Sequence, residues 1–221
     1  MHGLIRWAIV IGLPIGCHTD DTVTPDAPTE EAGLVVEWSS QPTPVPGDLG
    51  DGVTLERARF AFDSLRVIGD AGPGDPRTTA SGFEVRWDDT SRPEAILFTE
   101  APTGLYSQVS LQIDGHLVDD SYELRGRVFL NGTDWEYRIE DKNPLGLTVQ
   151  IDETLIPGDQ AIVRLRINFK HAIDAIDFEL LDIDEGRLEL DESDTQMPGF
   201  RQKLVESFEI INAGARLGTD D

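Results

Sequence analysis

The amino-acid sequence predicts a mainly β fold, an antiparallel β-sandwich or a partly open barrel, with a short helix near the C-terminal end. Apolar and polar residues alternate along several segments, as they do in strands that bury one face. An Asn131-Gly132 pair joins two of these segments, and no helical segments alternate with them. Half-polar strands joined by short turns are typical of antiparallel sheets. Roughly eight strands without intervening helices favour a sandwich or a barrel.

The predicted strands begin at residue 34 and end at residue 169. In the longest of them the alternation slips after Leu55 and again before Leu65, which predicts β-bulges. The segments on either side of Asn131-Gly132 are predicted to form a tight hairpin. Stretches rich in glycine and proline at 39–52 and 69–82 are predicted to be loops. The predicted strands span residues 34–38, 53–68, 83–87, 105–113, 122–130, 135–140, 145–151 and 163–169.

The C-terminal helix is predicted from a change of period. Phe200, Leu204 and Phe208 are spaced by four, as on one face of a helix. Pro198 suits the first helical position, and Gly214 lies beyond the expected end. We expect this helix to pack over an open end of the sandwich; an exposed helix that binds a partner is the alternative.

The chain is strongly acidic and has a single cysteine. It contains 42 Asp and Glu residues against 18 Lys and Arg, a formal net charge of −24. Such a chain repels phosphate backbones, so nucleic-acid partners are excluded. One cysteine cannot form an intramolecular disulfide or a cysteine-rich zinc site. The length suits one folded domain at 33–214, preceded by a flexible acidic tether at 17–32 and followed by a disordered tail at 215–221.

Residues 1–16 are predicted to be a lipoprotein signal peptide. Arg6 supplies a positive charge, and the apolar run 7–15 is too short to cross a bilayer as a helix. A small residue directly before Cys17 resembles the lipobox of bacterial lipoproteins, which implies cleavage before Cys17 and attachment of lipid to it. By the same resemblance, His18 favours the outer membrane. An ordinary secretory peptide is the alternative.

Catalytic motifs are absent from the sequence, which has no nucleophile elbow, zinc-protease motif, phosphate loop or dinucleotide fingerprint. We therefore expect a lipid-anchored, non-enzymatic protein of the cell envelope that binds the membrane through its lipid and a protein or glycan as partner. Trp135 and Tyr137 share one strand face and could form a platform for sugar, although core packing is the more common use. A glycan-acting enzyme is a third hypothesis, which requires two carboxyl groups across a cleft.

Ten acidic residues and one basic residue lie between residues 174 and 194. Within this stretch Asp182, Asp184 and Glu185 resemble the start of a calcium loop, because calcium prefers several carboxylate oxygens. The later ligand spacing of an EF-hand is missing. A metal-binding envelope protein, with calcium at these residues, is therefore the alternative hypothesis, and a solvated acidic strand edge is the simpler interpretation.

Three segments, 53–67, 101–106 and 204–210, resemble small bacterial β-sandwich lipoproteins. Two groups share this plan: domains of the DUF4382 type and the copper-associated MbnP-like proteins. The resemblance implies a sandwich in the cell envelope. Its copper-associated branch implies a copper site, for which His116 and His171 are the candidates, but the tryptophan-rich copper motif of that group is not recognisable in this sequence.

Overall fold

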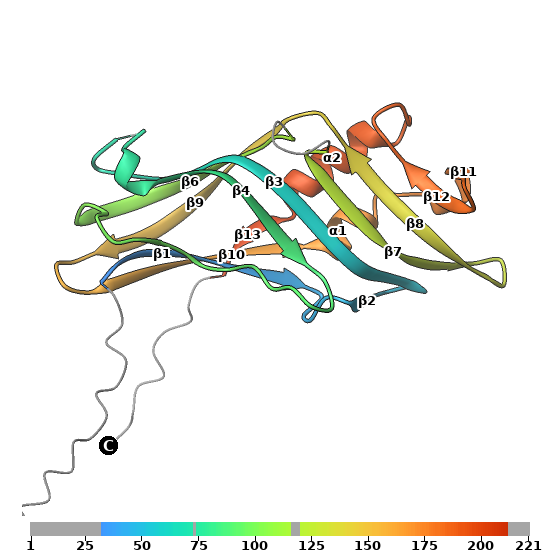
Figure 1. Ribbon diagram of the computed structural model, residues 1–221, viewed down its shortest axis with the longest axis horizontal. Helices are drawn as coiled ribbons and strands as arrows, with labels where there is room; N and C mark the ends of the chain where they lie inside the picture. The colour runs from blue at the N-terminus through green and yellow to red at the C-terminus, as the bar shows by residue number, and fades with distance from the viewer. Residues whose placement is uncertain (1–31, 73, 116–119, 212–221) are drawn as a thin grey trace, which may run out of the picture. The chain divides into compact units, whose positions relative to one another are not determined.

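The computed structural model describes residues 32–72, 74–115 and 120–211, and it confirms the mainly β prediction. Strands account for 57% of the structure and helices for 12%. The strands form two sheets that enclose the hydrophobic core, and the described residues form no closed barrel (Figure 1). The predicted signal peptide with Cys17, and the predicted tail at 215–221, lie outside the described residues, as does all but one residue of the predicted tether.

The smaller sheet has four strands, and its central pair is parallel. β1 and β10 pair along their whole lengths, from Gly33 opposite Gln160 to Gln41 opposite Asn168. This departs from the antiparallel pairing that the alternation predicts, because a parallel partner reached by a long connection leaves no turn signal in the sequence. The strands lie in the order β13 (Phe208–Ile210), β10 (Gln160–Asn168), β1 (Gly33–Gln41) and β5 (Ile96–Phe98).

The larger sheet has nine strands arranged around the long strand β3 (Val53–Gly69). All of its pairs are antiparallel except β12 with β8. Its main path runs β11 (Asp182–Asp184), β12 (Arg187–Leu190), β8 (Thr133–Asp141), β7 (Tyr122–Leu130), β3, β6 (Gly104–Ile113) and β9 (Leu145–Leu155), while β2 (Gly47–Gly50) and β4 (Thr79–Trp87) also pair with β3.

The register of β3 divides this sheet into two parts, which we call wings: one contains β7, β8, β12 and β11, and the other contains β6 and β9. β7 pairs with the first half of β3 and β6 with the second half, while β4 pairs with residues of both halves. Because each edge of a strand holds one neighbour at a time, β6 and β7 follow one another along one edge and β4 lies on the other. The pairings shift between Leu55 and Arg57 and between Phe62 and Ser64, so both predicted bulges are confirmed.

The predicted hairpin is also confirmed. β7 and β8 pair from Leu130 opposite Thr133 onward, and Asn131 and Gly132 both have positive φ, at 50° and 82°. A two-residue turn in which both residues have positive φ has a backbone twist that matches the right-handed twist of the strands it joins, and it is therefore common in tight hairpins. The ends of other predicted strands differ: β4 begins at Thr79, β2 forms inside a predicted loop, and Phe169 opens helix α1 (Phe169–Ile173).

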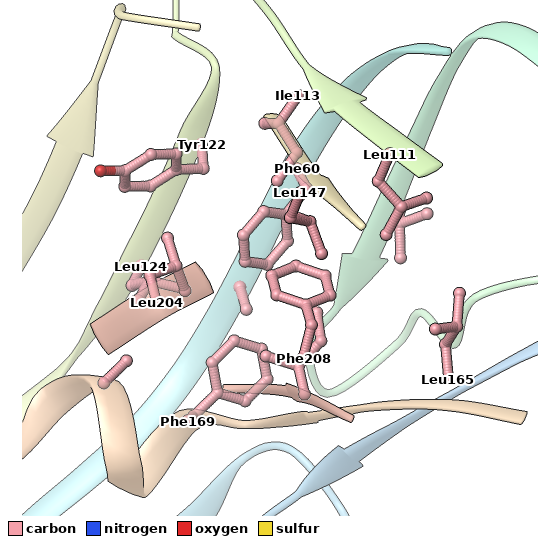
Figure 2. Close-up of a cluster of buried hydrophobic side chains, with 14 of the residues drawn as sticks. Phe60, Leu111, Ile113, Tyr122, Leu124, Leu147, Leu165, Phe169, Leu204 and Phe208 are labelled. Carbon is pink, nitrogen blue, oxygen red and sulfur yellow. The ribbon is translucent and has the colours of Figure 1, made fainter. Parts of the chain in front are cut away.

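The core is rich in aromatic side chains, shown in Figure 2. The ring of Phe60 stacks on Phe169 at 6.2 Å and meets Phe208 edge-on at 5.9 Å. Such pairs stabilise a core beyond the area that they bury. Two short 3-10 turns lie at Pro76–Thr78 and Phe178–Leu180.

Helix α2 (Met197–Glu206) confirms the predicted C-terminal helix, with Pro198 in its first turn. The helix is shorter than predicted: Phe208, expected on its apolar face, instead begins β13 and pairs with Ile167 on β10. Helix α2 buries Met197, Phe200 and Leu204 and lies where the two wings part (Figure 1). The ring of Phe200 packs 6.2 Å from that of Tyr122 on β7. Among the described residues, no helix combines the length and apolarity needed to cross a membrane.

Candidate functional site

Three arginines lie directly opposite one another across the outer face of the large sheet. Arg57 on β3 is opposite Arg125 on β7, and Arg125 is opposite Arg138 on β8. Their chain neighbours Leu124 and Ile139 are fully buried, so the arginines point away from the core. We call these three residues the arginine row. Like charges directly opposite one another destabilise a sheet, and the arrangement therefore calls for a physical reason.

Each ion pair made by the row uses only one guanidinium nitrogen. Nη2 of Arg125 donates to Glu123 at 2.7 Å, and the ion pairs of Arg138 also run through Nη2. The Nε atoms of both arginines are buried without a hydrogen-bond partner. Arg57 is exposed and makes no ion pair with any described residue. By contrast, Arg201 binds Asp141 through Nε and Nη2 together. The row thus keeps donors that the protein itself does not use.

An acidic triad, Asp120, Glu123 and Glu140, pairs with two members of the row, Arg125 and Arg138. Oxygens of the three carboxyl groups lie within 4.8 Å of one another, close enough to ligate a cation. Nη2 of Arg138 lies 3.9 Å from Asp120 and 3.3 Å from Glu123, and it also contacts Glu140. Nη2 of Arg59 lies 3.4 Å from Asp120. A guanidinium group therefore already supplies positive charge to the triad, whose role in this structure is to orient arginines.

The pKa values of Glu140 and Glu123 shift in opposite directions. Burial raises the pKa of Glu140 above its usual range, and the carboxylates of Asp120 and Glu123 add to the effect against the opposing charge of Arg138. Burial also acts on Glu123, but the hydrogen bond from Arg125 and the surrounding guanidinium charges bring its pKa below the usual value. Glu123 is therefore the firmly ionised partner of the row.

A cleft of about 420 Å³ opens beside the row. It lies where the bulge in β3 faces Gly126 on β7. A Cβ at Gly126 would lie 1.9 Å from the carbonyl oxygen of Thr54 and 2.6 Å from the hydroxyl oxygen of Tyr137. The Tyr137 hydroxyl donates to that same carbonyl at 2.9 Å. The missing side chain at Gly126 thus leaves room for Tyr137 to cross beneath the strand on its core side.

A fourth arginine, Arg187 on β12, lines the far end of the cleft. Its Nη2 donates to Glu189 at 3.0 Å and lies 3.4 Å from Glu185, while its buried Nε has no partner. This arginine repeats the pattern of the row: one nitrogen is engaged and other donors remain unused.

The cleft also contains carboxylates, so it is not uniformly basic. Asp88 accepts hydrogen bonds from the amides of Thr90 and Ser91, and the Thr90 bond first of all lowers the pKa of Asp88 to about 2. Glu136 lies 3.7 Å from Arg127. Glu56 and Asp89 complete the acidic part of the lining. A mixed lining suits one compact anionic group better than a long run of negative charge.

The structure places the predicted calcium residues on the hairpin formed by β11 and β12. Asp182, Asp184 and Glu185 are exposed, and Glu185 and Gly186 make the tight turn with φ of 49° and 84°. Among the described residues, the acidic triad alone brings three possible metal ligands together, and these three residues are not part of it. Calcium binding at Asp182, Asp184 and Glu185 stays a prediction.

Of the copper candidates, His171 lies on α1, exposed, with Nε2 3.4 Å from a carboxylate oxygen of Glu206. His116 lies outside the described residues.

Trp135 and Tyr137, the pair that could form a platform for sugar, belong to the hydrophobic core. Tyr137 is buried with its ring 5.1 Å from Phe178, and Trp135 is half-buried against the core.

Sequence reasoning missed the arginine row, although part of it was within reach. The two-residue turn at Asn131-Gly132 fixes the pairing of the hairpin, and that pairing sets Arg125 opposite Arg138. Arg57 could not be added, because the bulge shifts its register by one residue.

The fold and this site together define a β-sandwich with an arginine-lined cleft. A comparison of the chain with known protein families, with curated proteins and with solved structures found no match.

Proposed function

We propose that this chain is a lipid-anchored protein of the bacterial cell envelope that binds, without catalysis, a ligand carrying one oxyanion. The observation that carries the proposal is the arginine row with its unused donors. Arginine presents a planar fork of donors that matches carboxylate and phosphate groups, so these are the chemical classes that the row suits.

The energetics of the row support a binding role. Aligned guanidinium groups repel one another, and buried donors without acceptors lower the free energy of unfolding. An anion placed over the row would relieve the repulsion between the guanidinium groups. Arrangements that lower stability in this way are typical of functional sites.

The cleft has the dimensions and chemistry of a binding site. Its volume of about 420 Å³ falls within the range of small-molecule sites. Guanidinium groups stay protonated at physiological pH, so the row can orient an anion but cannot exchange protons with it. These properties favour binding over acid–base catalysis.

The proposed anchor rests on the sequence. Cys17 is the sole cysteine of the chain and directly follows an apolar run ending in a small residue. We expect radiolabelled palmitate to be incorporated into the wild type in bacterial cells and not into Cys17→Ser. Gel autoradiography of both forms, at equal expression, measures this, and equal labelling of both would contradict the anchor.

Replacing Arg57 with glutamine separates binding from stability. Because Arg57 has no ion-pair partner and faces Arg125, we expect Arg57→Gln to change the free energy of unfolding by less than about 0.5 kcal/mol. Affinity for the oxyanion should fall by roughly three- to tenfold, since one charged donor is lost. Isothermal titration with acetate and with inorganic phosphate, each of which carries one oxyanion, measures the affinity and distinguishes carboxylate from phosphate.

The matched control is Arg86→Gln on β4. Arg86 has comparable exposure, but its Nη2 pairs with Glu84 at 2.8 Å and it lies outside the cleft. Its substitution should leave both titrations unchanged. If neither probe binds the wild type, or if both variants lose affinity equally, the arginine row is not the binding site.

A further inference from the structure

The sandwich is open along one side, where two strand edges have no partner strand among the described residues. β4 pairs with β3 on one edge only. β5 pairs with β1 only at Leu34–Val36, so the rest of that β1 edge, Glu37–Gln41, is also unpaired. A free strand edge presents backbone donors and acceptors in a row and can accept an additional strand.

A groove of about 390 Å³ runs along the free edge of β4. Consecutive residues of β4, from Phe83 to Arg86, line it together with residues 91–96 on the opposite side. Alternate residues of a strand point to opposite faces, so a lining of consecutive residues means that the edge itself, with its backbone, borders the groove. The groove therefore follows a strand direction, which suits an extended chain.

Aromatic side chains form the apolar wall of the groove. Trp38 and Phe83 both line it and are half-buried, with ring centres 6.3 Å apart. Trp38 also packs 5.2 Å from the buried ring of Phe62. This wall continues into the core and offers an incoming apolar side chain a rigid surface.

The indole nitrogen of Trp38 supplies an independent observation. Its Nε1 is buried and donates to no acceptor among the described residues. A buried donor without an acceptor is uncommon and costs about 1–3 kcal/mol. Residues 91–95, which flank the groove, belong to no helix or strand, so they can shift without breaking a strand ladder.

We propose that the free edge of β4 binds an extended peptide segment of a partner protein. The peptide pairs through its backbone with Phe83–Trp87, the part of β4 that follows Gly82 with its positive φ of 65°. One apolar side chain rests on Trp38 and Phe83, and a peptide carbonyl accepts from the Trp38 indole. This is strand addition, in which backbone bonds give affinity and side-chain pockets give specificity.

The charges of the groove favour selection by an apolar side chain. Its rim carries Glu84 and Glu94 against Arg86 and Arg92, two charges of each sign. Neither a strongly acidic nor a strongly basic peptide gains from such a rim. The proposal is independent of the arginine row, because none of that row lines this groove.

A peptide selection tests the proposal. Random twelve-residue peptides displayed on phage are selected against the full chain carrying Cys17→Ser, and the enriched peptides are synthesised for isothermal titration. Phe83→Ala should weaken binding by about tenfold or more, and Trp38→Phe, which keeps a ring but removes the N–H, by a few-fold. Leu105→Ala, an exposed apolar residue on β6, should leave affinity unchanged.

Backbone pairing has its own measurement. Hydrogen exchange of the Phe83–Trp87 amides should slow when peptide is bound, and peptides N-methylated at alternate residues should not bind. The proposal is overturned if no peptide is enriched, if protection falls on another segment, or if N-methylation has no effect. A dimer of the free chain that buries β4 would also overturn it, because the edge would then belong to a second copy.

Discussion

Replacing Asp141 with alanine is expected to lower the free energy of unfolding by about 3–5 kcal/mol, the range seen when one partner of a buried ion pair is removed. The Asp141 carboxylate, at the end of β8, accepts from Arg201 Nε at 2.6 Å and Nη2 at 2.8 Å. It also accepts from the Tyr122 hydroxyl at 2.8 Å and from the Asn143 amide at 3.0 Å. Asp141 is only 1% exposed, so water cannot replace these bonds in the variant.

The size of this effect follows from what Asp141 connects. Arg201 belongs to α2, and Tyr122 begins β7. The Asp141 carboxylate therefore links the helix to strands β7 and β8. The alanine variant leaves the buried Tyr122 hydroxyl with only the weak acceptor Met197 Sδ, 3.6 Å away, and it leaves Arg201 without its anion. Both losses add to the destabilisation.

Urea unfolding followed by circular dichroism measures the loss, and Glu209→Ala is the matched control. Glu209 pairs with Arg166 at 2.7 Å, but both side chains are more than a third exposed, at 40% and 35%. Surface pairs of this kind contribute less than about 1 kcal/mol. Equal losses from the two variants would show that Asp141 does not fasten α2.

The same carboxylate gives the protein a dependence on pH. Burial opposes ionisation of Asp141, but the hydrogen bonds from Arg201, Asn143 and Tyr122 outweigh it and lower the pKa below the usual 3.8. A lowered pKa in the folded state stabilises the fold above the unfolded pKa, and this stabilisation is lost as pH falls through the folded value. The wild type should therefore lose more stability than Asp141→Asn on acidification below about pH 4.

The sequence predicted local features of the fold well, because local chemistry determines them. The Asn131-Gly132 turn requires two residues with positive φ, and the bulges in β3 appear as slips in the alternation of side chains. The parallel pairing of β1 with β10 joins segments more than a hundred residues apart, as the bond from Ser39 Oγ to Leu165 O illustrates. No local pattern encodes such a pairing, and it decides which edges stay open.

The candidate site was predictable only in part, for the same reason. Alternation shows that Arg125 and Arg138 face outward, and the hairpin turn aligns them. The triad needs Asp120, which precedes β7, and the cleft needs the bulge opposite Gly126. The acidic stretch at 174–194 drew attention by composition, yet its densest part, at Asp182, forms an exposed edge strand. Clustering in sequence is a weaker guide to a site than register across strands.

Arg138→Met should lower the free energy of unfolding by roughly 2–3 kcal/mol at neutral pH, because it leaves the acidic triad without its shared cation. Arg138 contacts all three carboxylates, and it is the sole cation paired with Glu140 among the described residues. The pKa of Glu140 is already raised and should rise further in the variant. A raised folded pKa favours the fold at low pH and penalises it as pH rises through that value, so the deficit should shrink on acidification toward about pH 4.5.

The variant also tests what the triad would do without its arginine. With oxygens within 4.8 Å of one another and the shared Arg138 removed, the three carboxylates should accept calcium, although Arg59 still pairs with Asp120 and Arg125 with Glu123. Millimolar calcium should then raise the melting temperature of Arg138→Met, while the wild type, in which Arg138 supplies the charge, should not respond at this site. The control is Arg127→Met, whose partners Asp134 and Glu136 are exposed; it should cost less than about 1 kcal/mol and show no change with calcium. If Arg138→Met is as stable as the wild type at every pH, the triad does not depend on Arg138 for its charge balance.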